Sequence, residues 1–443
     1  MSPARRPADW VQHAIFWHLY PLGFTGAEKS ALGDHAVMQR LRHVEAWLDY
    51  AIELGCSGLA LGPIFASETH GYDTLDHMKI DARLGDDHDF DHLVSAAHAR
   101  GLKVVLDGVF NHVGRSFPRF RDVLANGEAS RWSRWFRRKG PGPEDFAVFE
   151  GHGSLVTLNH HEPEVAAYVS EVIAHWLARG ADGFRFDAAY AMPPAFFQSL
   201  LPSLRERFPE AFFFGEVIHG DYAQFVADGG LDSVTQYELW KATWSAINDR
   251  NFFELAWTLE RHSQLLEKCL PLTFVGNHDV TRIASRITDE RHLPHALVAL
   301  LTLPGIPSIY AGDEQAFRGV KEERVGGDDA IRPAFPAEPT GLAPFGWPVY
   351  RLHQALIALR RRHPFLQQAR LQIDTRTNPA LVYTCKDPNT AAAISVVLNV
   401  GDEPYTGPFP LRRLLSSTRG EPGTAAEPAH VEPHGWLIGA RTD

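Results

Sequence analysis

Four apolar runs in this sequence each end in polar side chains that could perform acid–base or nucleophilic chemistry. The four segments are VVLDGVFNH at 104–112, GFRFDA at 183–188, FFFGEV at 212–217 and FVGNHD at 274–279. A single carboxylate in such a place is more often a helix N-cap than a catalyst. If the runs are parallel strands of one barrel, however, their carboxyl ends meet on one face, where active sites are built. The set of side chains, rather than any one of them, therefore indicates a shared site.

The acids in these segments fit a reaction that proceeds through a covalent sugar intermediate. Two carboxylates on adjacent barrel strands can lie roughly 5 Å apart, the separation at which one attacks the anomeric carbon and the other protonates the leaving oxygen. A metal ion held between two acids would also satisfy the pattern. Arg185 stands two residues before Asp187, on the same side of the strand, where it would repel a cation and keep the carboxylate ionised. We therefore favour the sugar reaction.

Eight apolar runs, alternating with helical patterns, would position these segments. The runs are 14–19, 58–64, 103–106, 183–186, 212–215, 231–234, 272–275 and 308–310. The clearest helical pattern, at 165–177, has apolar residues at three- and four-residue spacing and ends at Gly180. Strands that are apolar at almost every position are typical of parallel sheets covered by helices. The sequence therefore predicts the α/β fold class and a closed (β/α)8 TIM barrel.

Two regions depart from the repeating pattern and predict attached units. About fifty residues separate the third run from the helix that starts near Pro163, whereas barrel loops usually have two to six. We assign 112–159 to a small inserted subdomain. Near the end of the chain, short β-like runs separated by Pro/Gly-rich turns predict a C-terminal all-β domain at 366–443. The barrel then has a first part at 1–111 and a second part at 160–365.

Charge, apolar content and cysteine usage exclude several classes of protein. The 443 residues carry a formal net charge of -11, which offers no cationic surface to a nucleic acid or an anionic membrane. The N-terminus lacks the apolar core of a secretory signal, and no apolar stretch of about 18 residues follows. Cys56, Cys269 and Cys385 lie far apart and form neither a disulfide framework nor a metal motif. We expect a cytoplasmic protein without nucleic-acid or membrane partners.

The four segments, in their order and on the expected strands, resemble the signature regions of the α-amylase family, glycoside hydrolase family 13. Further likeness lies at Gly71-Tyr72-Asp73, at Leu158-Asn159 and at 305–314. The resemblance covers nearly the whole chain. It implies a (β/α)8 barrel with a subdomain inserted after the third strand and a β-sandwich at the C-terminus, in agreement with the pattern of runs.

The resemblance also implies a role for each matching residue. It makes Asp187 the nucleophile, Glu216 the general acid/base and Asp279 the acid that stabilises the transition state. Asp107 would support Arg185 rather than touch the substrate. The substrate-binding residues that it implies are Tyr72, which would stack on the sugar, His112 and His278, which would bind its hydroxyls, and Arg185, which would contact Asp187.

The match is incomplete where many relatives bind calcium. Those relatives have Lys and His shortly after the nucleophile, and this chain has Tyr190 and Ala191 instead. Asn111 alone does not make a site of six to eight oxygens. We expect no required metal and no other cofactor.

Two further features bear on the substrate and the partners. Thr69 stands where many exo-acting α-glucosidases of the family have an Asp, three residues before the stacking tyrosine, which favours maltooligosaccharides, cyclodextrins or similar α-glucans. The segment 120–132 resembles the inserted subdomain of the neopullulanase, cyclomaltodextrinase and maltogenic amylase relatives. Those relatives usually have an extra N-terminal domain, which we expect to be absent because the first run starts near residue 14. We expect a monomer or a homodimer.

The sequence thus predicts a retaining glycoside hydrolase that cleaves mainly α-1,4-glucosidic bonds in an oligosaccharide substrate, either maltooligosaccharides or related α-glucans. A transglycosylase (glucanotransferase) or an α-glucosidase-type enzyme would use the same three acids, so the motifs leave these alternatives open. A non-catalytic binding relative is disfavoured, because such proteins usually lose an acid and this chain retains Asp187, Glu216 and Asp279.

Overall fold

The structure, a computed structural model, describes residues 7–31, 36–140, 142, 145–324, 326–418 and 422–441. The outer ends of the predicted ranges 1–111 and 366–443 lie outside the described residues. Within the described part of the chain, none of the helices is both long enough and apolar enough to cross a bilayer.

Eight parallel strands form the central barrel, one at each of the eight predicted runs. They are β1 (Phe16–Leu19), β2 (Gly58–Leu61), β5 (Lys103–Gly108), β8 (Gly183–Phe186), β9 (Phe212–Gly215), β10 (Ser233–Val234), β11 (Leu272–Phe274) and β12 (Ile306–Tyr310). The order in the sheet is β10-β9-β8-β5-β2-β1-β12-β11. A bridge between Thr235 and Leu272 joins its two ends and closes the barrel. The predicted TIM barrel is confirmed.

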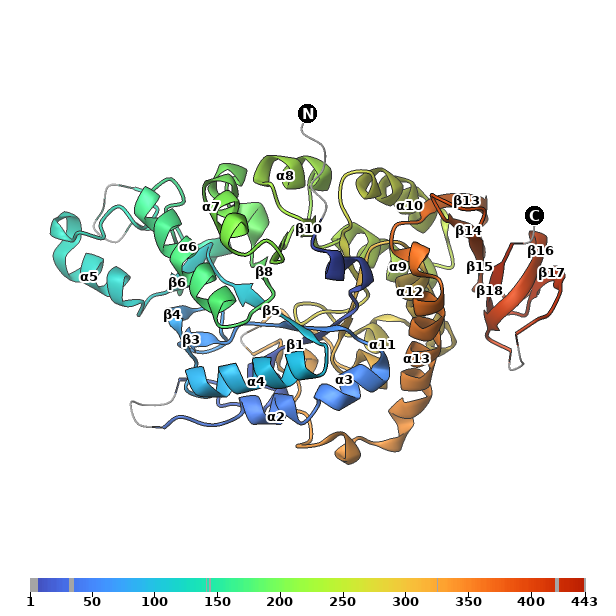
Figure 1. Cartoon of the computed structure of the whole chain (residues 1–443), viewed down its shortest axis with the longest axis horizontal. Helices are drawn as coiled ribbons and strands as arrows, with labels where there is room; N and C mark the ends of the chain where they lie inside the picture. Colours follow the sequence, from blue (N-terminus) through green and yellow to red (C-terminus); the bar gives the residue numbers. More distant parts are fainter. Residues whose placement is uncertain are drawn as a thin grey trace.

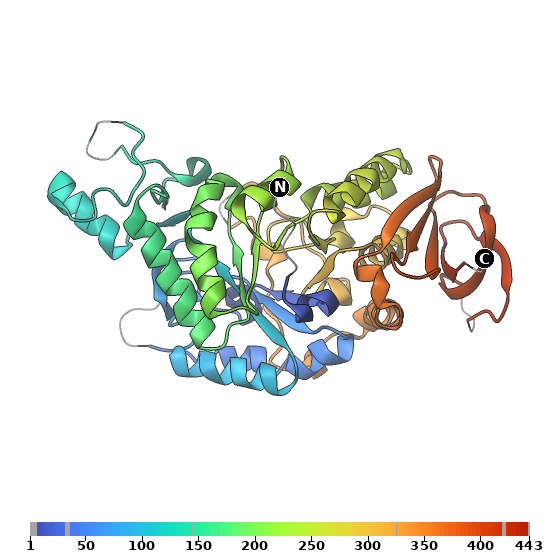
Figure 2. The same cartoon turned by 45° about the horizontal axis from the view of Figure 1, so that its top comes forward.

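Helices surround the barrel (Figures 1 and 2). The longer ones are α3 (Leu48–Leu54), α4 (Asp87–Ala99), α6 (Pro163–Ala178), α7 (Pro194–Arg207), α8 (Tyr222–Gly229), α9 (Tyr237–Asn248), α10 (Phe253–Leu266), α12 (Leu293–Thr302) and α13 (Trp347–Arg362). Short helices are α1 (Pro21–Phe24), α2 (Leu41–Glu45) and α11 (Ile283–Arg286). The predicted helix before Gly180 is α6: Pro163 occupies its first turn, and Gly180 has a φ of 104°, which favours glycine.

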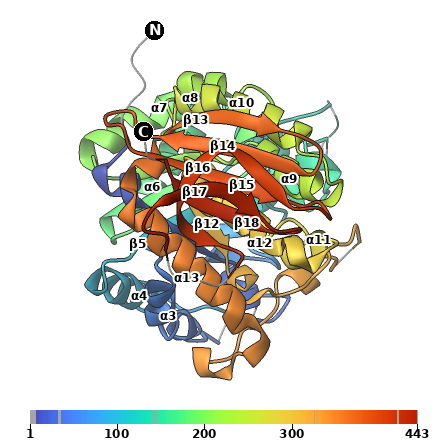
Figure 3. The same cartoon turned by 90° about the vertical axis from the view of Figure 1, so that its right-hand side faces the viewer.

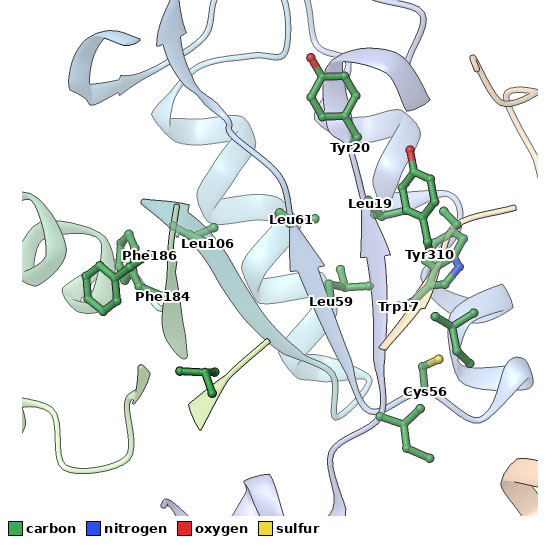
Figure 4. Close-up of a cluster of buried hydrophobic side chains, with 14 of the residues drawn as sticks. Trp17, Leu19, Tyr20, Cys56, Leu59, Leu61, Leu106, Phe184, Phe186 and Tyr310 are labelled. Carbon is green, nitrogen blue, oxygen red and sulfur yellow. The ribbon is translucent and has the colours of Figure 1, made fainter. Parts of the chain in front are cut away.

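Successive residues of the barrel strands face opposite sides, and this alternation divides the core into two layers. Figure 4 shows side chains of the outer layer, between strands and helices: Trp17, Leu19, Leu59, Leu61, Leu106, Phe184 and Phe186. The alternate residues, among them Phe16, Ala60 and Val105, form a second cluster inside the barrel. Arg185 lies between Phe184 and Phe186, so the same alternation turns its guanidinium inward.

The long connection between β5 and β8 folds into a small unit at one end of the molecule (Figures 1 and 2). It contains β6 (His112–Gly114), α5 (Pro118–Asn126) and β7 (Leu155–Thr157), and β6 pairs with β7 in antiparallel fashion. A second ribbon, β3 (Phe65–Ser67) with β4 (Thr74–Ile80), lies in the connection after β2. The predicted boundaries of this subdomain and of the other domains stay predictions.

The C-terminal region is an antiparallel sheet at the other end of the molecule (Figure 1), and Figure 3 shows it facing the viewer. Its strands are β13 (Arg370–Arg376), β14 (Ala380–Lys386), β15 (Ala393–Asn399), β16 (Tyr405–Ser416), β17 (Ala426–Val431) and β18 (Trp436–Ala440). All six are hydrogen-bonded into one sheet, where the resemblance implied a sandwich. Buried contacts join the sheet to the barrel. Among them, the hydroxyls of Tyr383 and Thr302 lie 2.5 Å apart.

Candidate active site

A cleft of about 1220 Å³ opens at the carboxyl ends of the barrel strands. The three predicted catalytic acids, Asp187, Glu216 and Asp279, all line it, as do Tyr72 and His112. Asp187 and Glu216 are each 6% exposed. The three predicted acids, Tyr72 and His112 therefore share one hollow. Arg185 and His278, which were also predicted, do not line this cleft and lie among the inner side chains of the barrel.

One guanidinium contacts three of the acids from below the cleft. Arg185 lies 2.5 Å from Asp107, 3.4 Å from Asp187 and 2.9 Å from Glu216. Because Arg185 is 7% exposed, little water screens these interactions. The predicted contact with Asp187 is present, but the shortest distance is to Asp107, which supports the arginine as expected.

The register of the strands sets this arrangement. Asp107 is the direct partner of Arg185 across β5 and β8. The ladder continues past the strand ends, since the amide of Asp187 donates to Gly108 O at 3.1 Å and the amide of Glu216 donates to Phe186 O at 2.9 Å. The nucleophile candidate and the acid candidate therefore leave neighbouring strands at adjacent levels.

Burial and neighbouring acids change how Asp187 ionises. Burial raises the pKa of Asp187 well above its ordinary value, and the carboxylates of Glu216 and Asp107 add to this, although Arg185 opposes it. The sequence argument gave Arg185 the larger influence, and burial outweighs it here. Asp187 therefore retains a proton more readily than an isolated carboxylate would. For a double displacement, that proton has to reside on Glu216 while Asp187 is ionised.

Asp279 has the opposite electrostatic surroundings. Its carboxylate lies 2.9 Å from His278 Nε2 and accepts a hydrogen bond of 2.9 Å from Arg332 Nη2. Although burial acts to raise it, these two neighbours and Arg185 hold the pKa of Asp279 well below its ordinary value. Asp279 is thus set to remain charged in the cleft.

The predicted sugar-binding residues surround these acids. The phenol of Tyr72 donates to Asp107 at 3.2 Å and also bonds His278 Nε2. His278 Nδ1 lies 2.9 Å from His18 Nε2, so both of its ring nitrogens have partners. His112 stacks on Phe149, with ring centroids 4.7 Å apart, and burial lowers its pKa to about 3. These groups are held in place before any substrate arrives.

Two residues of the site were missed by the sequence argument. Arg332 reaches Asp279 from the long loop after β12, more than twenty residues beyond the strand, where no strand-end pattern could reveal it. Tyr237 donates a hydrogen bond of 3.0 Å to Glu216. It begins α9 just after β10, so collecting the end of the sixth run would have found it.

The residues that replace the usual calcium ligands do not fit such a site. The phenol of Tyr190 donates to Glu150 at 2.6 Å across the cleft, and Ala191 has no side-chain oxygen. Asn111 bonds His112 through its amide group at 3.1 Å. A calcium ion needs six to eight oxygens, and this set supplies too few. We derive no step of the reaction through a metal, and the expectation of no required metal stays a prediction.

Comparisons with known proteins agree with this geometry. The family model for the α-amylase catalytic domain matches residues 18–341. The cyclomaltodextrinase of Geobacillus thermopakistaniensis is 30% identical over 441 residues, covering 91% of this chain and 71% of that protein. Neopullulanase 2 of Thermoactinomyces vulgaris is 30% identical over 431 residues, with 90% and 71% covered.

A solved structure gives the same answer over almost the full length. The acarbose-soaked debranching enzyme of Nostoc punctiforme superposes with a TM-score of 0.82 at 27% identity, and the alignment covers 98% of this chain and 99% of that one. With the family model spanning most of the barrel and its inserted segment, this chain belongs to the α-amylase family of glycosidases.

Proposed function

We propose that this protein is a retaining hydrolase of α-glucosidic bonds, mainly α-1,4, in maltooligosaccharides or related α-glucans. The observation that carries the proposal is the position of Asp187 and Glu216, which leave adjacent strands, contact the same guanidinium and face one cleft. A nucleophile and a proton donor must both face the bond that is cleaved, and two carboxyl groups held by one guanidinium at one cleft meet that requirement.

In the first step, a carboxylate oxygen of Asp187 attacks the anomeric carbon of the bound sugar. The bond to the leaving oxygen breaks, its electron pair stays on that oxygen, and Glu216 gives it a proton. The product is a glucosyl ester on Asp187 and a shortened sugar. In the second step, Glu216 takes a proton from water while the water oxygen attacks the same carbon, and the ester bond breaks.

The remaining residues of the site stabilise this sequence. Charged Asp279 faces the positive charge that develops on the sugar ring, and Arg332 and His278 hold it. Arg185 steadies both reacting carboxylates. Tyr72 offers a ring to the sugar face and His112 offers a neutral imidazole to its hydroxyls.

Several observations favour an oligosaccharide rather than a short glucoside. The cleft of about 1220 Å³ exceeds the roughly 300–1,000 Å³ of ordinary small-molecule sites. Thr69 lines the cleft, but its backbone amide and hydroxyl both bond Asp73, so no carboxylate is presented there to the end of a sugar chain. Relatives named cyclomaltodextrinase and neopullulanase fit the same class of substrate.

We further propose that the protein works in the cytoplasm, as a monomer or a homodimer. The three cysteines are unpaired, and Cys56 and Cys385 are buried, which suits a reducing compartment. Light scattering of the purified protein gives the oligomeric state directly.

A product screen tests the proposed function. The purified protein is incubated with maltotriose, cyclodextrin, pullulan, maltose, sucrose and trehalose, and the anomeric form of the first product is followed by NMR. We expect hydrolysis of maltotriose or cyclodextrin with the α-anomer released first. Longer sugars appearing early would favour transglycosylation, and release of the β-anomer would overturn the retaining mechanism.

A further inference from the structure

A chain of hydrogen bonds connects two of the proposed catalytic acids through side chains to which no role has been given. The amide of Asp279 donates to Asn277 Oδ1 at 2.9 Å. Asn277 Nδ2 donates to the hydroxyl of Tyr237 at 2.8 Å, and that hydroxyl donates to Glu216 Oε1 at 3.0 Å. The direction of each bond is fixed, because Asn277 Oδ1 faces an N–H group and only Nδ2 is left for the phenol.

Packing fixes the Tyr237 ring that delivers this hydroxyl. The residue is 7% exposed, and its ring lies edge-on to Phe274 and to Trp240, with centroids 4.9 and 5.9 Å away. Burial raises the pKa of Tyr237 well above its ordinary value, so the phenol stays protonated and can donate. The hydroxyl accepts one hydrogen bond, from Asn277, and donates one, to Glu216, so both bonds can form at the same time.

The bonds to Glu216 distinguish its two oxygens. Oε1 receives Tyr237 and lies 2.9 Å from Arg185 Nη2, so two donors occupy it. Oε2 receives one bond, from the amide of Ala188 at 3.0 Å. A protonated carboxyl group needs one oxygen free of competing donors, and Oε2 is the less occupied of the two.

We propose that Tyr237, oriented by Asn277, is a positioning residue that holds Glu216 so that Oε2 carries the proton delivered to the leaving sugar. The inference rests on the proposed function and deepens it. During glycosylation the Oε2–H bond breaks as the leaving oxygen gains the proton. During hydrolysis of the ester, Oε2 regains a proton from the attacking water. Oε1 keeps its two donors throughout, so the carboxyl group does not have to turn between the steps.

The test compares two substrates whose leaving groups differ in their need for a proton from an acid. Maltotriose has a sugar leaving group that requires protonation, whereas fluoride leaves α-maltosyl fluoride with little help. Since kcat/KM reports the glycosylation step, loss of acid positioning lowers it selectively for maltotriose. For Tyr237→Phe we expect kcat/KM to fall at least about tenfold more on maltotriose than on the fluoride, as suits a partial loss of general acid catalysis.

Two further variants complete the design. Asn277→Ala should show the same selective loss to a smaller extent. Adding it to Tyr237→Phe should change the ratio of kcat/KM on the two substrates little, because both residues act through the one contact of Tyr237 with Glu216. Tyr383→Phe removes a buried phenol at the barrel–sheet contact and should leave the ratio unchanged. Thermal unfolding of each variant checks that it folds.

The outcomes separate the inference from the function on which it rests. Equal losses of kcat/KM on both substrates, or no loss for Tyr237→Phe, would overturn the positioning role while leaving the proposed hydrolase function intact. If Tyr237→Phe does not fold, Asn277→Ala alone decides on the same criterion. A wild-type protein inactive on both substrates would overturn the proposed function itself, and the inference with it.

Discussion

In the described part of the chain, one cluster of histidines and carboxylates lies at the cleft and another lies where the barrel meets the C-terminal sheet, and the two differ in how their charges are balanced. The rim cluster consists of Asp187, Glu216 and Asp279, which line the cleft, and His278, which is buried beside Asp279. The interface cluster (Asp289, His292, His295, Asp402 and His434) lies where the barrel meets the C-terminal sheet. Asp289, His292 and His434 even place ligand atoms within 4.8 Å of one another.

Most polar atoms of the interface cluster are paired with nearby side chains or backbone groups, although His295 Nδ1 is buried without a hydrogen-bond partner. His292 and His434 bond each other at 2.9 Å, and the other ring nitrogen of His434 lies 3.0 Å from Asp402. Asp402 is also paired with Arg250 at 2.7 Å, and Arg291 binds Asp289. None of these described residues lines the cleft. Residue types alone would mark this cluster as a site, and its matched charges argue against one.

The rim cluster has more acids than nearby cations, and a cavity beside them. Asp107, Asp187 and Glu216 share one guanidinium, which leaves negative charge available to a sugar cation. An excess of one charge, facing space, is therefore the feature that separates a reactive cluster from a structural one.

The largest expected effect comes from the matched pair Asp187→Asn and Asp289→Asn. The first removes the nucleophile, and we expect turnover of maltotriose to fall by at least about 10³-fold, with the same for Glu216→Gln. The second alters the interface cluster and should leave turnover near that of the wild type. Near-normal rates for Asp187→Asn on an activated glucoside would contradict the assignment of the nucleophile.

A second pair compares the arginines, Arg332→Met with Arg250→Met. Arg332 binds charged Asp279, and losing such a bond costs about 1.5–3 kcal/mol, so kcat should fall roughly 10- to 100-fold. Because Arg332 holds the pKa of Asp279 low, its removal should also move the acidic limb of the pH–rate profile to higher pH. Arg250→Met should leave the profile where it is; a shift there would blur the distinction between the clusters.

A third test uses the pH dependence of stability at the interface cluster. Burial, with the neighbouring His292, lowers the pKa of His295 to about 4, below its ordinary 6.5. Between about pH 4 and 6.5, His295 is therefore protonated in the unfolded chain but neutral in the folded one. The free energy of unfolding should rise with pH across this window. His295→Gln should flatten that slope by at most about 1.4 kcal/mol per pH unit, measured by chemical denaturation across the window.

The smallest expected effect is that of removing metals. Dialysis against a chelator should change neither turnover nor the thermal transition, since Arg291 occupies Asp289 and the calcium positions lack oxygens. Activity that is lost and then restored by calcium would contradict our interpretation of Tyr190 and Ala191. If Zn²⁺ raises the thermal transition temperature of the wild type but not that of His434→Gln, the interface cluster would be identified as a metal site.

The sequence predicted the barrel well because its strands are buried on both sides and read as continuous apolar runs. In the predicted C-terminal domain, the apolar runs at 381–384, 393–400 and 436–438 coincide with β14, β15 and β18, whereas the sequence argument missed β13, β16 and β17. Most residues of these strands are partly or fully exposed, and β16 contains Pro408 and Pro410, so neither composition nor continuity marked them.

For the site, the residues that follow strands directly were predictable, because parallel strands deliver their ends to one face. Arg332 was not, since its position depends on the path of a long loop rather than on any periodic pattern. The ionisation of Asp187 was also beyond a pairwise argument. Arg185 is visible in sequence as its neighbour, but the burial that outweighs it results from packing of the whole barrel.

The closure of the barrel is uneven, and this has a mechanical consequence. Among the described residues, one bridge joins the ends of β10 and β11, between Thr235 and Leu272, with a backbone bond of 2.9 Å from the amide of Gln236 to Leu272 O. The hydroxyl of Ser233 adds a side-chain bond of 2.6 Å to Leu270 O. Tyr237 and Asn277 stand just above that seam and bind across it. Separation of β10 from β11 would displace Tyr237 and Asn277, the side chains that contact the proposed catalytic acids. The strand junction with the fewest backbone hydrogen bonds is therefore also the one whose closure the proposed positioning of Glu216 most requires.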